Sequence, residues 1–394
     1  MRRGHRLIPG VLCGGGLVVA LAHAQLPDRE NQFLERQTRA LAEPFRGVTT
    51  DGQIVPGLFA IHPTRLSTAD VRRAAQVFLA SLTEAQRRNT IFPIDDSEWR
   101  RWDNVPSPPS PPRFGVMLDE MSEHQRQLAF DLIGASLSAK GLKQTQDIMK
   151  LNATLADITQ DKRFAQWFYS MTVMGTPSDT EPWGWQLEGH HLAINYFVLG
   201  DQLVMTPTFI GAEPARAVAG PFAGTSVLQN EQDKGLRLFV SLTNDQQAKA
   251  TLSTQKGRAD NVGAAYRDNL VLDYAGILAT DMQDSQRRLL LDLISEHLAN
   301  LPRDQARLRM DEVTRHLDRT YFAWIGSGEP GAVFYYRIQS PVILIEFDHQ
   351  SPARFPNDPP TRDHIHTIVR TPNGNDYGKD LLRQHYAQHP HTQQ

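Results

Sequence analysis

Apolar residues along the chain follow two kinds of spacing, which come in the same order in each half of the sequence. Helical spacing, with apolar residues three or four apart, covers 68–82 and the stretch from Met121, and later 232–242 and the stretch from Met282. Strand-like runs follow: WGWQLEG, HHLAINYFVL and QLVMTPTFI in the first half, and AVFYYRIQSP, VILIEFDHQ and HIHTIVRTP in the second. The pattern predicts an α+β protein with antiparallel strands.

Two stretches of sequence recur at almost the same distance. The triplet SLT at 81–83 returns 160 residues later at 241–243, and GVMLDEMSEHQRQLAFDLI from Gly115 matches GILATDMQDSQRRLLLDLI, 161 residues further on from Gly276. Self-similarity at one spacing indicates a duplicated unit. We therefore expect two tandem helix-plus-sheet repeats, 25–220 and 221–394, packed as one body about a pseudo-two-fold axis. Thr83 and Thr243 are the expected N-caps of one helix in each repeat.

The first 24 residues have the features of a signal peptide. Arg2, Arg3 and Arg6 precede an apolar, glycine-rich run, and the small residues Ala22 and Ala24 mark a cleavage site before Gln25. The apolar run is too short to predict a stable membrane span. We expect an exported protein, periplasmic or secreted, and since the only cysteine lies in this segment we expect no thiol chemistry in the mature chain.

Charge and motifs exclude several classes of function. The net charge is −3 and no basic run occurs, so nucleic acid is not an expected partner and a small or neutral substrate fits better. The sequence contains no glycine-rich phosphate loop, no GxSxG motif and no HExxH helix, which disfavours nucleotide cofactors, standard serine hydrolases and zincins.

Five histidines interrupt the strand-like runs and are the strongest candidates for chemistry: His190, His191, His349, His364 and His366. His364 and His366 are two residues apart, so on a strand both imidazoles leave the same face and can reach one ion. Zinc, iron, manganese and copper all accept such nitrogen ligands. A third ligand then has to come from elsewhere, and His190, His191, His349, Asp348 and Glu346 are candidates. The alternative is that these histidines are structural or bind substrate directly.

Acidic and aromatic residues suggest a second scheme. Glu346 and Asp348 alternate onto one face of a buried strand, where carboxylates need partners, so they are candidates for a general acid and base. Trp185 and Tyr336 would offer surfaces for a substrate such as a sugar, and the turn-rich segment RTPNGNDYG would present Arg370 and Asn375. The simpler alternative is that the acids pair with arginines, the aromatics belong to the core and the segment is only a turn.

Three long motifs carry a resemblance to a known family. PWGWQLEGHHLAINYFVLGDQLVMTPTFIGAEP, YFAWIGSGEPGAVFYYRIQSPVILIEFDHQ and RDHIHTIVRTPNGNDYGKDLLRQHY look like a large family of bacterial and fungal secreted or hypothetical proteins that is known only as a domain of unknown function. The resemblance covers most of the mature chain. It implies export and one continuous unit, and it brings no assigned activity or catalytic residue.

These observations lead to one preferred function and three alternatives. We expect an exported metal-dependent enzyme, a hydrolase rather than an oxidoreductase, with one site at the junction of the two repeats. The five histidines are the candidate metal ligands, and Glu346 or Asp348 would move protons on water held by the metal. The alternatives are a metal-independent, carboxylate-driven enzyme acting on carbohydrate, a metal-dependent oxidoreductase, and a periplasmic binding protein without activity. The sequence leaves the oligomeric state open.

Overall fold

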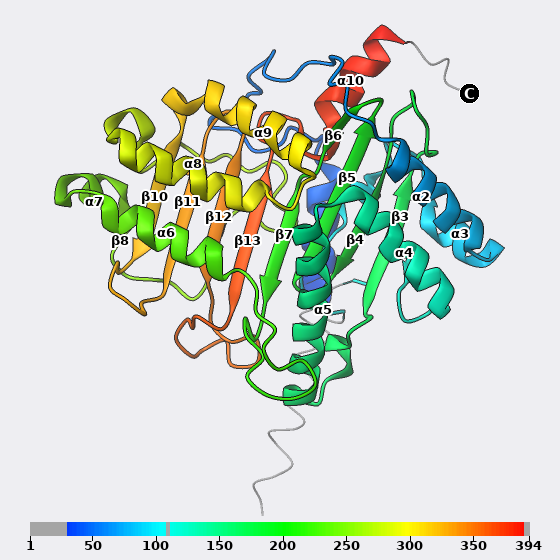
Figure 1. Ribbon diagram of the computed structural model, residues 1–394, viewed down its shortest axis with the longest axis horizontal. Coiled ribbons are helices and arrows are strands. Elements are labelled where there is room, and N and C mark those ends of the chain that lie inside the picture. Colours follow the sequence, from blue (N-terminus) through cyan, green and yellow to red (C-terminus); the bar gives the residue numbers. More distant parts are fainter. Residues whose placement is uncertain (1–29, 108–110, 390–394) are drawn as a thin grey trace, which may run out of the picture.

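A single large sheet forms the centre of the computed structural model, which describes residues 30–107 and 111–389 (Figure 1). The expected signal peptide at 1–24 lies outside these residues. The main path of the sheet contains, in spatial order, β1 (Ile91–Phe92), β3 (Tyr169–Met174), β4 (Trp183–Gly189), β5 (Leu192–Leu199), β7 (Thr208–Ala212), β13 (Ile365–Arg370), β12 (Leu344–His349), β11 (Phe334–Gln339), β10 (Tyr321–Gly326) and β8 (Thr251–Ser253). Three short strands pair beside this path: β2 (Val116–Met117), β6 (Gln202–Val204) and β9 (Ile277–Leu278).

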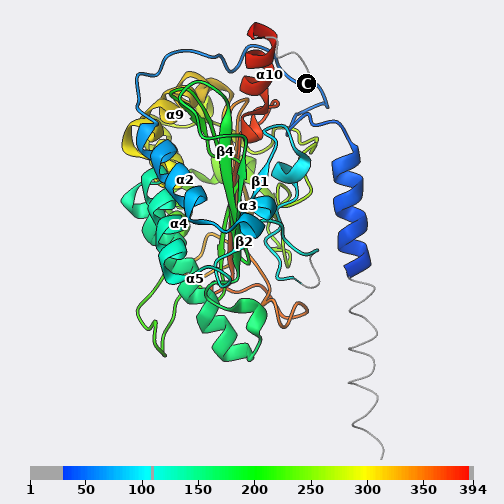
Figure 2. The same cartoon turned by 90° about the vertical axis from the view of Figure 1, so that its right-hand side faces the viewer.

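Most of the helices cover one face of the sheet, as Figure 2 shows for α2, α4, α5 and α9 with the sheet seen edge-on. The helices are α2 (Ala69–Ser81), α3 (Glu84–Thr90), α4 (Glu123–Ser136), α5 (Ala139–Thr159), α6 (Gln229–Ser241), α7 (Asn244–Ala250), α8 (Asp284–Leu298), α9 (Arg303–Arg315) and α10 (Lys379–Gln388). A further helical segment covers residues 30–42. Thr83 and Thr243 cap α3 and α7 through reciprocal bonds with Gln86 and Gln246, which confirms the two predicted N-caps.

Both faces of the sheet are buried, which explains why the strands read as nearly continuous apolar runs. One core lies under the helices and includes Trp185, Tyr336 and Phe347. A second, smaller core lies on the opposite face and includes Phe209 and Ile368. Helix α10 contributes Leu381 and Leu382 to this core, and irregular chain also covers this face, for example the segment at 256–263 described below.

The α+β class is confirmed, but the expectation of purely antiparallel strands is wrong at the two edges. Neighbours are antiparallel from β3 through to β10, whereas β1 pairs with β3 and β8 pairs with β10 in parallel. Parallel pairing needs a long crossover connection. Helices α4 and α5 lie between β1 and β3 along the chain, and α8 and α9 between β8 and β10.

The two halves of the chain meet where β7 pairs with β13. These strands are antiparallel, with Ile210 opposite Thr367 and Gly211 opposite His366. Beyond the strand ends, the hydroxyl groups of Thr206 and Thr371 share a hydrogen bond of 2.7 Å. In the parts of the chain that the structure describes, no helix is both long enough and apolar enough to cross a membrane.

Candidate metal centre

The His-x-His pair lies at the beginning of β13, on the face of the sheet opposite the helices. His364 directly precedes the strand and His366 is its second residue. The Nε2 atoms of the two imidazoles are 2.9 Å apart, and both side chains are buried. Both rings therefore reach one point, as the spacing of two residues predicts.

His191 brings a third imidazole to the same point from the other half of the chain. It lies in the turn between β4 and β5 with a φ of 65°, a left-handed conformation that few residues other than glycine adopt. Its backbone is fixed there, because its N–H donates to the Asn104 carbonyl and its carbonyl accepts from the Gly211 N–H. Its Nε2 lies 3.2 Å from His364 Nε2. His191, His364 and His366 thus form a cluster whose ligand atoms all lie within 4.8 Å of one another.

His190 supports the cluster from behind. Its ring stacks on that of His191 at a centroid distance of 3.7 Å, and the ring of Phe164 contacts it at a centroid distance of 4.6 Å. The Nδ1 atom of His190 is 2.6 Å from Asn152 Oδ1, so this nitrogen carries the proton and donates it to the amide oxygen. His190 therefore orients its neighbour and is not part of the group of three.

A glycine makes room for the rings. A Cβ atom at Gly211 would lie 2.9 Å from Cδ2 of His366 and 3.1 Å from Cδ2 of His191, closer than side chains normally approach. Any larger residue would push one imidazole or both away from the cluster. Gly211 is thus a positioning residue, which the sequence signals only as one glycine in a strand.

A backbone carbonyl fixes the ring of His364 from behind. Its Nδ1 lies 2.6 Å from the Ser351 carbonyl oxygen, which can only accept, so Nδ1 carries a proton and donates it. The carboxylate of Glu213 lies 3.7 Å from the same Nδ1. Such a carbonyl or carboxylate behind the ring is the usual way to fix a metal-binding imidazole.

His364 Nε2 cannot form a hydrogen bond with both of its neighbours. It approaches both His191 and His366, yet one ring nitrogen has either one proton or one lone pair and makes one hydrogen bond. Burial, together with the neighbouring histidines, holds the pKa of His191 and of His366 well below the ordinary histidine value, so both rings are neutral at pH 7. One of the two contacts is therefore left without a hydrogen bond, and a cation between the rings would compensate for it.

The spacing of the nitrogens suits a small transition-metal ion. With zinc-to-nitrogen bonds of about 2.0–2.1 Å at tetrahedral angles, two ligand nitrogens are about 3.3 Å apart. Two of the three separations, 2.9 and 3.2 Å, differ from that value by only a few tenths of an ångström, and the third is within 4.8 Å. Three neutral imidazole nitrogens can hold zinc, iron or copper, and a fourth position is left for another ligand.

The structure does not bring His349 into this cluster. Its Nδ1 accepts from the backbone N–H of Phe334 at 3.0 Å, and its Nε2 lies 3.0 Å from Gln232 Oε1. Both ring nitrogens are therefore occupied, and burial lowers the pKa of His349 to about 3. This histidine ties β12 to β11 and α6.

Glu346 and Asp348 hold a loop on the back of the sheet. The Glu346 carboxylate accepts from the backbone N–H groups of Val262 and Gly263 and from the Tyr335 hydroxyl, all at 2.7–2.8 Å. Asp348 accepts from the backbone of 260 and 261 and pairs with Lys256 at 2.9 Å. Burial raises the pKa of both carboxyl groups, while these donors oppose the shift. These bonds occupy the carboxylates with the segment at 256–263.

The four candidate substrate-binding residues lie in the interior. Trp185 donates to Ser136 and stacks on Tyr196, and Tyr336 donates to the carbonyl of Glu231. The other two fix the chain after β13. The Arg370 guanidinium binds Asp268 and Asp376, and the Asn375 side chain accepts from the backbone of Leu381 at 3.4 Å.

Comparison with known proteins gives a family but no activity. Residues 64–379 match a sequence-family model described as "Protein of unknown function (DUF3500)", which confirms the resemblance to a domain of unknown function. No curated protein and no solved structure matches the chain.

Proposed function

We propose a function on the premise that this chain belongs to the DUF3500 family of proteins of unknown function, so that its chemistry has to be argued from its own residues. In this proposal the protein is an exported metal-dependent enzyme that holds one transition-metal ion on the Nε2 atoms of His191, His364 and His366. A hydrolase acting on a small or neutral substrate is the preferred activity.

One observation carries the metal proposal: three buried imidazoles direct Nε2 atoms at one another although their protons cannot satisfy both contacts. A buried polar group without a partner costs about 1–3 kcal/mol, so a fold does not assemble such a group without compensation. An ion at the centre would accept all three lone pairs at once. The supporting groups on the far side of the rings, namely Ser351, Glu213 and the stacked His190, fit that role.

The ligand set favours hydrolysis over redox chemistry if the ion is zinc. Three neutral imidazoles leave the full charge of the ion in place, and zinc so bound lowers the pKa of a water molecule to about 7. Iron or copper on the same ligands would instead support oxidoreductase chemistry, so the identity of the metal separates the two. Glu346 and Asp348 enter this proposal as groups that hold the segment at 256–263, since their oxygens are already engaged.

Metal analysis of the purified mature chain tests the proposal. The protein should be prepared without a polyhistidine tag, and its content of zinc, iron, manganese and copper measured by mass spectrometry. We expect about one equivalent in the wild type and a loss of at least 90% in His364→Ala and His366→Ala. His124→Ala is the matched control, because His124 is exposed on α4 and far from the cluster in sequence. An empty wild-type protein that also fails to bind any of the four metals on titration would refute the proposal.

The hydrolase assignment needs a separate measurement. Uncharged p-nitrophenyl esters are suitable general probes, and we expect turnover that is lost on chelation and restored by zinc. Full metal occupancy with no turnover on esters, together with bound iron or copper, would favour an oxidoreductase.

We also propose that the fold is a tandem duplication. Strand order supports it, because β1-β3-β4-β5-β7 and β8-β10-β11-β12-β13 run outwards to inwards in the same succession from the two edges. Side-chain contacts repeat as well: Gln125 donates to Ser81 and Gln86, and Gln286 donates to Ser241 and Gln246. The histidines do not repeat, so the proposed ion occupies one site rather than two. A structural superposition of 64–212 on 224–370 that fails to align these strands would contradict the duplication.

Export is the remaining part of the proposal. The basic, apolar and small-residue segments at 1–24 support it. Expression of the full chain in a bacterium, followed by N-terminal sequencing, should give a mature protein that begins at Gln25. Recovery of the uncleaved chain from the cytoplasm would contradict this part alone.

A further inference from the structure

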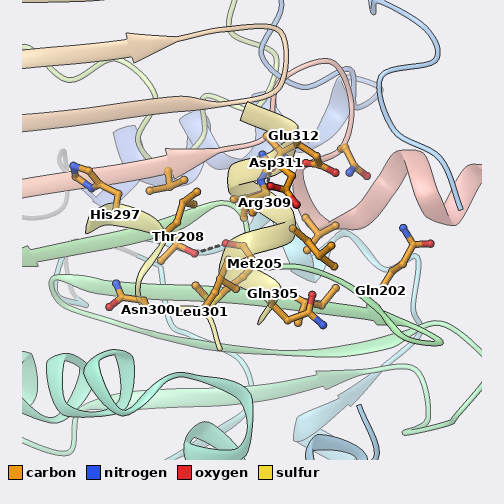
Figure 3. Close-up of a pocket in the computed structure, with 18 of the residues that line it drawn as sticks. Gln202, Met205, Thr208, His297, Asn300, Leu301, Gln305, Arg309, Asp311 and Glu312 are labelled. Atoms are coloured by element: carbon orange, nitrogen blue, oxygen red, sulfur yellow. Dashed lines mark hydrogen bonds and ion pairs between the residues drawn. The ribbon is translucent and has the colours of Figure 1, made fainter. Parts of the chain in front are cut away.

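A cavity of about 150 Å³ lies on the helix-covered face of the sheet, across the junction of the two halves (Figure 3). Its floor is formed by side chains of β7 and β13, such as Thr208 and Val369, and its sides by α9 and by the turn that follows α8. His366 points to the opposite face of β13, because neighbouring residues on a strand alternate. The sheet therefore separates this cavity from the candidate metal centre.

Two residues that line this cavity have a side-chain amide oxygen without a partner. Gln144 on α5 and Asn300 after α8 both line it, and both side chains are more than 90% buried. Gln144 Oε1 and Asn300 Oδ1 accept no hydrogen bond from any residue that the structure describes. Rotating either amide by 180° would replace the unpartnered oxygen with an unpartnered NH₂ group, so each amide has a group without a partner in either orientation.

The position of Asn300 is built into the fold. The Ser138 N–H donates to the Asn300 carbonyl, and Gly141 approaches so closely that a Cβ there would lie 2.6 Å from the same oxygen. Gln144 follows Gly141 by three residues, on the same side of α5. The start of α5 therefore fixes both amides at one end of the cavity.

The rest of the wall contains both apolar and polar side chains, and its buried charge is paired. Asp311 and Arg315 also line the cavity, but both are exposed to solvent. Met205, Leu298 and Leu301 contribute apolar surface. Glu231 at the inner end pairs with Lys140 at 3.1 Å, and Arg309 nearer the rim pairs with Glu312. Since a charged ligand would find no free counter-ion at the inner end, its burial would be costly.

His297 adds no charge at the inner end. Tyr336 donates its only proton to the Glu231 carbonyl, so His297 Nε2, 2.8 Å from the Tyr336 oxygen, must be the donor in that contact. Burial lowers the pKa of His297 to about 3, and the ring is neutral. The inner end thus offers hydrogen-bonding groups without net charge.

We propose that this cavity binds a small uncharged molecule that joins an apolar ring or branched body to an amide or hydroxyl group. The polar group would pair with Gln144 and Asn300, and the apolar body would pack against Met205, Leu298 and Leu301. A cavity of about 150 Å³ accommodates benzene, so the ligand has about six to ten non-hydrogen atoms. This site is independent of the metal proposal, because the two lie on opposite faces of the sheet.

Benzamide is a suitable probe, with toluene and benzoate as comparators of similar size. Binding to the mature protein can be measured by calorimetry and by the shift in unfolding temperature. We expect benzamide to bind at least tenfold more tightly than benzoate. In the double variant Gln144→Met and Asn300→Leu, which keeps side-chain volume, benzamide should bind at least tenfold more weakly while toluene binds no less tightly. Gln146→Met on the same helix is the matched control, since Gln146 does not line the cavity, and should bind benzamide like the wild type.

If the double variant fails to fold, a crystal structure of the wild type with benzamide tests the proposal instead. The amide of the probe should lie within hydrogen-bond distance of Gln144 or Asn300. Ordered water on both amides with no displacement by benzamide, or equal affinity of wild type and double variant, would overturn the proposal. Metal content should be unchanged in the double variant, and His366→Ala should still bind benzamide. A cavity that does not bind benzamide can therefore be distinguished from a metal site that does not bind metal.

Discussion

The substitution Gly211→Ala tests the candidate metal centre without touching a ligand. The added Cβ would lie 2.9 Å from Cδ2 of His366, 3.0 Å from the Ile365 carbonyl oxygen and 3.1 Å from Cδ2 of His191. Carbon atoms in contact are normally about 3.5–4.0 Å apart, so the two rings must retreat by about half an ångström. Metal ligands tolerate displacements of only about 0.2 Å, so the ligand set should no longer fit one ion.

The expected effect is large on metal binding and moderate on folding. Changes to groups that position ligands typically reduce metal affinity by about 10–100-fold, and overpacking a core costs about 1–3 kcal/mol. Zinc affinity can be measured by competition with a chromophoric chelator, at a temperature where thermal unfolding shows the variant to be folded. Gly134→Ala is the matched control: in α4 the nearest atom to its new Cβ is Leu142 Cδ2 at 3.4 Å, and affinity should not change. Wild-type zinc affinity in folded Gly211→Ala would refute the assignment of these rings as ligands.

Three further predictions concern buried groups outside the cluster. Glu346→Gln should lower the free energy of unfolding by about 1–3 kcal/mol, because one N–H donor of the 262–263 backbone then meets an NH₂ group. Activity per folded molecule should not change. A loss of turnover without a loss of stability would instead show that Glu346 is a catalytic residue. Burial and the neighbouring Glu188 raise the pKa of Glu98 to about 8, so protonated Glu98 stabilises the fold below about pH 4.5 and this stabilisation is lost as the pH rises to 8. The unfolding temperature should therefore fall between pH 4.5 and 8, and it should fall less in Glu98→Gln. Parallel pH profiles of the wild type and the variant would contradict this account. Gly378→Ala should lower the free energy of unfolding, measured by chemical denaturation, by about 2–4 kcal/mol, since the φ of Gly378 is 65° and a Cβ would lie 2.1 Å from the Phe197 ring. An unchanged denaturation midpoint would show that the ring moves aside freely.

Local pattern was a good guide where neighbours in sequence decide the outcome. The capped helices at 84–90 and 244–250 follow from threonine and glutamine three residues apart, and the strands at 344–349 and 365–370 follow from apolar runs. The approach of His364 and His366 follows from strand alternation in the same way. The parallel edge strands did not follow, because strands of two or three residues carry no signal of their partners.

Contacts between distant segments could not be read from spacing. Alternation places His190 and His191 on opposite faces, but the left-handed turn at His191 lets the two rings stack. Glu346 looked available for proton transfer because its backbone donors lie 83 and 84 residues away along the chain. Gly211 and Ser351 matter through their position beside the imidazoles, and a glycine or a backbone carbonyl has no chemical signature in a sequence.

The pairing of β7 with β13 determines when the proposed metal site can form. His191 and His364 are 173 residues apart, and the three nitrogens meet only once both halves have folded and these two strands have joined. An unfolded chain passing through a membrane would therefore carry no preformed site. If the protein is exported in that state, the metal it contains would be decided by the ions available in the destination compartment, since imidazole ligands alone discriminate weakly between zinc, iron and copper. Protein folded in the cytoplasm after removal of residues 1–24 could then contain a different metal from the exported form.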